Sequence, residues 1–148
     1  MKSRLKTNIQ TLPRPRPGRA LGPVRVLWLQ LPGADPPPTK KLRTALARAN
    51  LLVYTVDIHP RLGEACRLFD LIMLCVTNQT TDEVVDAVLQ IRSSSLAPIA
   101  LLTVQEPSTM ALAALPAGAD MAMYIHLPEK VIAARCLALL RRWRQHLW

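Results

Sequence analysis

Between residues 24 and 148, five short apolar segments alternate with segments of helical periodicity, and few folds accommodate that order. The apolar segments are 24–29, 51–56, 71–76, 99–104 and 121–125. They are rich in Val, Ile, Leu and Met, and Pro, Asn or Asp precedes each of them, as is typical of strands that begin after a turn. Nearly every residue in the first four is apolar, which predicts strands buried on both faces of a sheet.

Each predicted strand is followed by a segment in which apolar residues recur at helical spacing. Thr39 is a suitable N-cap for the first helix and Thr80 or Thr81 for the third, while Pro116 and Gly118 are expected to end the fourth. Strands buried on both faces and joined by helices form a parallel sheet with right-handed crossovers. We therefore expect an α/β protein with a doubly wound (βα)5 sheet. Its predicted helices are 40–49, 61–69, 82–92, 107–115 and 129–148.

The N-terminal segment differs in character from the rest. Seven of the 19 Lys and Arg residues lie in residues 1–25, which hold no Asp or Glu, and the whole chain has a formal net charge of +9. Pro alternates with Arg there, which disfavours both a helix and a central strand. We therefore expect a disordered or extended basic arm over 1–23 and one folded domain over 24–148.

The arm has two open interpretations. It either only solubilises the chain, or it binds an anion: nucleic acid, an acidic protein surface or an anionic membrane. The cationic side chains that would bind the anion are Lys2, Arg4, Lys6, Arg14, Arg16 and Arg19.

Several functional classes are not expected. The apolar runs are too short for a transmembrane segment, and the N-terminus has no apolar core of a signal peptide. Three cysteines without a C-x-x-C motif predict free thiols in a reducing compartment, and hence a cytoplasmic protein. A glycine-rich phosphate loop and a zinc-ligand spacing are both missing, so the sequence predicts no cofactor and no metal.

Four local motifs resemble the receiver domain of two-component response regulators. Asp70 with the following LIMLCV resembles the third strand of a receiver, and PIALLT at 98–103 resembles the fourth. Gly-Ala-Asp at 118–120 is similar to the motif before the fifth strand, and YIHLP at 124–128 matches aromatic-x-x-Lys-Pro except at Lys. The resemblance covers 24–142 and implies a flavodoxin-like, receiver-like fold with its functional edge at the carboxyl ends of the strands.

The resemblance also implies where the phosphoryl-transfer site would lie, and the chain departs from the family there. Cys75 occupies the position of the phosphoacceptor Asp in receivers, and Leu127 occupies the position of their lysine. Gln30 and Leu31 occupy the positions of the acidic pair that ends the first strand. Only Thr103, Tyr124 and Pro128 keep the residue type of the family. Mg²⁺ needs hard oxygen ligands that a thiol, an amide and a leucine do not supply. We therefore expect a pseudo-receiver that is not an enzyme and serves signalling or regulation as a phosphorylation-independent interaction module.

Receivers also dimerise or dock partners through the face formed by their fourth helix, fifth strand and fifth helix. By resemblance, this chain is expected to bind a protein partner or to form a homodimer through its last helix, with the basic arm as a second contact. Trp and Arg are enriched at binding hot spots. Trp143 also fits the apolar stripe of the last helix, in which case it belongs to the core. The candidate residues are Tyr124, Arg135, Arg141, Arg142, Trp143, Arg144 and Trp148.

Two alternatives remain open. The first is a nucleic-acid-associated protein whose arm binds phosphates while the fold serves as a spacer or dimeriser, although the sequence shows no aromatic stacking platform. The second is an enzyme or redox switch built on Cys75, with His126 as a partner for the thiol. A buried free cysteine is more often a small hydrophobic residue, so the interaction module is the favoured hypothesis.

Overall fold

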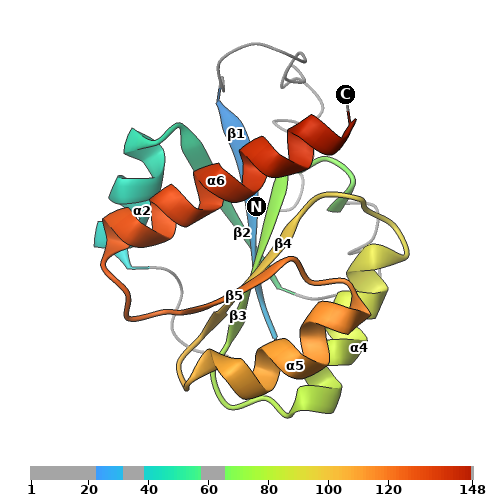
Figure 1. Cartoon of the computed structure of the whole chain (residues 1–148). Coiled ribbons are helices and arrows are strands. Elements are labelled where there is room, and N and C mark those ends of the chain that lie inside the picture. Colours follow the sequence, from blue (N-terminus) through green and yellow to red (C-terminus); the bar gives the residue numbers. More distant parts are fainter. Residues whose placement is uncertain (1–22, 32–38, 58–65, 148) are drawn as a thin grey trace.

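The computed structural model describes residues 23–31, 39–57 and 66–147. Figure 1 shows a central sheet with helices on both faces. All neighbouring strands are parallel, in the order β2-β1-β3-β4-β5, which confirms the predicted doubly wound sheet. Apart from Pro23, the arm predicted over 1–23 lies outside the described residues. The strands are β1 (Val24–Gln30), β2 (Leu51–Asp57), β3 (Leu71–Val76), β4 (Ile99–Thr103) and β5 (Met121–Tyr124).

Four helices of the described part cover the sheet. Thr39 caps the first of them by accepting a hydrogen bond from the Leu42 amide, and Thr80 and Glu83 form a capping box at α4. The helix predicted over 61–69 falls mainly outside the described residues. None of the helices described is both long and apolar enough to cross a membrane. Their bounds are α2 (Lys40–Arg48), α4 (Thr81–Arg92), α5 (Pro107–Ala117) and α6 (Glu129–Leu147).

The core consists of two clusters, one on each face of the sheet. Successive strand residues point to opposite faces, so Leu27 and Leu74 pack beneath α4 and α5, whereas Trp28 and Met73 pack beneath α2 and α6. We name these the α4–α5 cluster and the α2–α6 cluster. The side chains of β3 are all buried, and each buried aliphatic side chain contributes about 1.5–3 kcal/mol. The near-absence of polar residues in this strand therefore follows from its central place in the sheet.

The fourth predicted helix ends later than expected. Pro116 is tolerated in the last turn of α5, and the helix continues to Ala117. Gly118 then ends it with φ of +126°, a backbone conformation that L side chains rarely adopt. The amide of Ala119 donates to the Ala114 carbonyl at 3.0 Å and closes the turn. Glycine, rather than proline, therefore sets this boundary.

Two aspartates link neighbouring strands by hydrogen bonds at the amino-terminal side of the sheet. Asp70 Oδ2 accepts hydrogen bonds from the Arg25 amide at 2.9 Å and from Arg25 Nε at 3.4 Å. Asp120 Oδ2 accepts from the Ile99 amide at 2.8 Å and from Arg92 Nη2 at 2.7 Å. Each aspartate immediately precedes a strand, and each joins that strand to a neighbour. The opposite edge, at the carboxyl ends of the strands, holds the predicted site.

Candidate functional site

The strand register brings the predicted site residues to one edge of the sheet. Gln30 pairs with Cys75, and Thr103 lies one pair further along, beside Val76. Leu31 directly follows β1, and the Leu127 amide donates to the carbonyl of Tyr124, the last residue of β5. Ligands of doubly wound sheets bind at this edge. The five residues are Gln30, Leu31, Cys75, Thr103 and Leu127.

The side chains of these five residues are poor ligands for a cation. Cys75 is fully buried in the α2–α6 cluster, Leu31 is buried on the opposite face, and Leu127 packs against the α2–α6 cluster. Thr103 Oγ1 donates to the carbonyl of Gln105 at 2.7 Å, so its hydroxyl proton is used within the chain. The described ranges contain no group of three His, Cys, Asp or Glu side chains placed to hold a metal ion.

The thiol of Cys75 is not activated by its surroundings. Burial raises its pKa from 9.0 to about 11, and burial also raises the pKa of Cys66 and of Cys136 to about 12. A thiol with a pKa near 11 is ionised to about one part in ten thousand at pH 7, and the thiolate is the reactive form. His126 is exposed and packs edge-on against Tyr124, with 5.0 Å between ring centroids. This geometry gives no support to a reactive pair of Cys75 and His126.

The candidate partner-binding residues fall into two groups. Tyr124, Arg135, Arg141 and Arg142 are exposed, whereas Trp143 and Arg144 are half-buried. Trp143 Nε1 donates to the carbonyl of Leu96 at 2.9 Å, and this bond ties the end of α6 to the loop before β4.

Arg144 is held within the domain in a different way. Burial lowers the pKa of its guanidinium, and the charge of Asp70 opposes that effect. Trp143 and Arg144 thus contact the domain itself, and the four exposed residues remain open to a partner. Trp148 lies outside the described residues.

The helix predicted over 107–115 belongs to the expected docking face, but none of the residues of α5 is among the candidates singled out from the sequence. This helix has no charged side chain, and its only fully buried residue is Ala114. Leu112 is 81% exposed and Leu115 is 42% exposed, and their spacing of three residues places them on one face. A helix that is apolar all round is normally buried, so this exposed face is unusual for a solvated surface. The signal was present in the sequence as the absence of charge over 107–117.

Comparisons with known proteins connect this geometry to receivers. No family model matches the chain, and no curated protein matches its sequence. A response regulator from Thermotoga maritima is similar with TM-score 0.63 and 13% identity, over 82% of this chain and 99% of that one. A two-component response regulator from Clostridium difficile is similar with TM-score 0.61 and 21% identity, over 80% and 97%.

A third similar structure is an atypical orphan response regulator. It has TM-score 0.59 and 21% identity, over 80% of this chain and 97% of that one, and its structure is described as revealing a new phosphorylation-independent regulatory mechanism. In all three cases the match covers nearly the whole of the other chain. The described domain therefore has the flavodoxin-like fold of response-regulator receiver domains.

Proposed function

We propose that this chain is a non-catalytic pseudo-receiver that binds a protein, either a partner or a second copy of itself, independently of phosphorylation. The residues at the carboxyl edge support the absence of phosphoryl transfer. Gln30, Leu31, Cys75 and Leu127 stand where the resemblance to receivers expects two acids, the phosphoacceptor and a lysine. A buried neutral thiol with a raised pKa is neither a carboxylate nor a magnesium ligand. The binding of phosphates by the basic arm stays a separate prediction.

The observation that carries the proposal is the exposed apolar face of α5. Leu112 and Leu115 lie on this helix, and α5 packs against the edge strand β5, which exposes Tyr124. On the other side of β5 lies α6, with exposed cations at Arg135, Arg141 and Arg142. We name these elements the α5–β5–α6 face. An apolar centre with aromatic and Arg neighbours is the composition of a protein interface.

Replacing the exposed leucines of this face by charged residues is expected to weaken association by at least tenfold. The double variant Leu112→Lys/Leu115→Lys places two charges on the apolar centre, and a loss of about 1.4 kcal/mol corresponds to a factor of ten. Sedimentation of the full chain measures self-association, and capture from native-host extract measures partner binding. Leu89→Lys, at an exposed leucine of α4, is the matched control. Unchanged association in the double variant, or an equal loss in the control, would contradict the proposal.

Treatment with acetyl phosphate and Mg²⁺ is expected to leave the mass of the chain unchanged. None of the five site residues has a carboxylate, so the acceptor and the metal ligands expected at their positions are missing. Intact-mass spectrometry measures the product, with a response regulator that has its phosphoacceptor Asp treated in parallel. A stoichiometric phosphoryl adduct on this chain would show that the site is not degenerate.

A further inference from the structure

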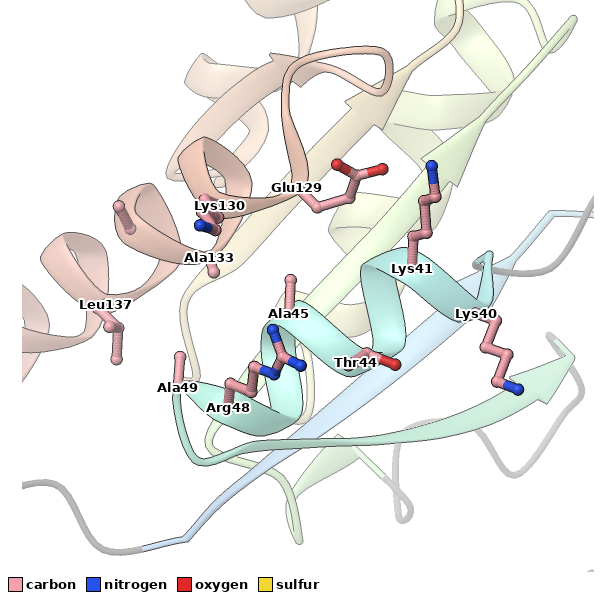
Figure 2. A pocket seen from close by; sticks show the side chains of 11 residues that line it. Lys40, Lys41, Thr44, Ala45, Arg48, Ala49, Glu129, Lys130, Ala133 and Leu137 are labelled. Carbon is pink, nitrogen blue, oxygen red and sulfur yellow. The ribbon is translucent and has the colours of Figure 1, made fainter.

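A groove of about 620 Å³ lies between α2 and α6, on the face of the sheet opposite α4 and α5. Figure 2 shows side chains of both helices around it. Its apolar lining consists mostly of alanines, with Ala45 on α2 and its C-cap Ala49 four residues apart, and Ala133 and Leu137 four residues apart on α6. Residues at this spacing share a helix face. The groove is therefore bounded by two helix faces whose short side chains allow a third backbone to come close.

The polar lining of the groove is strongly cationic. Four basic side chains line it against a single carboxylate, that of Glu129. The ion pairs of the described domain are Arg25–Asp70 and Arg92–Asp120, so none of the four cations forms one with a described carboxylate. All four are exposed. The groove therefore presents three uncompensated positive charges beside an apolar lining. The basic residues are Lys40, Lys41, Arg48 and Lys130.

The layout of the cations favours an extended occupant over a small anion. Lys40 and Arg48 are eight residues apart on α2, which corresponds to about 12 Å along the helix axis. One phosphate or carboxylate would contact only one end of this row, whereas two turns of a bound helix would span it. A helix that lies in a groove between two others makes such contacts along its length.

The described helices of a second copy of the chain do not match the groove well. The acidic helix of the described domain is α4, with Asp82, Glu83 and Asp86. Its apolar residues Val84 and Val88 are buried against the sheet, and its exposed apolar surface is a narrow strip of the half-buried Val85 and the exposed Leu89. That strip is narrower than the apolar lining of the groove, so an acidic helix with a full apolar face, from a different protein, fits the groove better than any helix of the described residues.

We propose that the α2–α6 groove binds an acidic, amphipathic helix of a protein partner. Small apolar side chains of that helix would pack on Ala45, Ala49, Ala133 and Leu137, and its carboxylates would pair with the four cations. This groove and the α5–β5–α6 face both use α6, but no residue belongs to both sites, so variants can test each site separately.

The test measures binding of a fluorescent helical peptide with Ala and Leu on one face and Glu on the other. Fluorescence anisotropy with the full chain is expected to show binding that weakens as salt is raised. Arg48→Glu is expected to weaken this binding at least tenfold. Arg43→Glu makes the same charge change on α2 at an exposed residue outside the groove lining, and it is expected to have less than a threefold effect. The basic arm is present in both variants, so its contribution to peptide binding is the same in the two measurements.

A second variant and two control ligands complete the experiment. Ala134→Phe fills the groove without changing its charge and is expected to weaken peptide binding at least tenfold. A peptide of the same composition in scrambled order is expected to bind at least tenfold more weakly. Equal effects of Arg43→Glu and Arg48→Glu, or equal binding of the two peptides, would overturn the proposal. Tighter binding of phosphatidylserine vesicles than of the peptide, lost in Arg48→Glu, would also overturn the proposal. That result would identify a membrane surface as the ligand of the groove.

Discussion

Replacing Arg92 by Met is expected to lower the free energy of unfolding by about 3 kcal/mol, because one guanidinium joins three segments of the chain. Its Nε donates to the Gly118 carbonyl at 3.1 Å, and its Nη1 donates to the Ala97 carbonyl at 2.6 Å and the Ser95 carbonyl at 3.2 Å. Its Nη2 donates to Asp120 at 2.7 Å. The side chain is 21% exposed, so solvent screens the ion pair only in part.

The turn after α5 is built around this arginine. Gly118 has φ of +126°, and a Cβ on it would lie 2.7 Å from Arg92 Cγ. The loss of Arg92 therefore removes both the bonds that hold this turn and the side chain that packs on it. A hydrogen bond to a charged group contributes about 1.5–3 kcal/mol when buried, and partial exposure reduces the sum for four such bonds.

Urea unfolding of the full chain measures the effect, and Arg67→Met is the matched control. Arg67 donates one hydrogen bond, from Nε to the Ser94 carbonyl at 3.2 Å, and it is exposed. Its loss is expected to cost less than about 0.5 kcal/mol, as is usual for a surface substitution. Similar losses in the two variants would show that the contacts of Arg92 do not stabilise the fold.

The sheet could be predicted from the sequence because its signal is local. In β3 all six residues are apolar, and a strand buried on both faces requires this composition. The N-caps at Thr39 and Thr80 are equally local, since each side chain bonds an amide three residues ahead. The gathering of Gln30, Cys75 and Thr103 at one edge follows from the parallel register, which strand order alone predicts. These features need no knowledge of distant contacts.

The remaining features depend on residues far apart in the chain. Trp143 bonds a carbonyl 47 residues away, and Arg92 bonds one 26 residues away. Helical periodicity places both side chains on a helix face, but it does not say which loop that face meets. The groove was missed for the same reason, because Ala45 and Ala133 become neighbours only when α2 and α6 pack together. The docking role of Trp143 was inferred from residue type, which does not reveal a partner within the same chain.

Raising the pH from 9 to 11 is expected to destabilise the fold steeply, because three buried thiols cannot ionise in it. Burial raises the pKa of Cys75 to about 11 and the pKa of Cys66 and of Cys136 to about 12, against an ordinary value of 9.0 in the unfolded chain. Above pH 9 the unfolded chain therefore binds fewer protons than the folded one, and the free energy of unfolding falls as the pH rises. The contribution of the thiols to stability is complete below pH 9 and is lost as the pH rises toward 12.

Each thiol is expected to contribute about 1.4 kcal/mol per pH unit within this window, and the three together about 4 kcal/mol per unit. Urea midpoints at pH 7, 9, 10 and 11 measure the slope. Lysines and tyrosines also titrate there, and comparison with single variants separates their contribution. Cys66→Ala and Cys136→Ala are each expected to reduce the slope by about one third, since each removes one thiol of similar burial.

The comparison of slopes, rather than of absolute stabilities, decides this prediction. Each Cys→Ala change also leaves a small cavity, which lowers stability by the same amount at every pH and so does not alter the slope. If Cys75→Ala removed the slope almost entirely while the other two variants kept it, Cys75 alone would ionise differently on unfolding. If all three variants kept the full slope, the thiols would ionise equally in the folded and the unfolded chain, and burial would not raise their pKa.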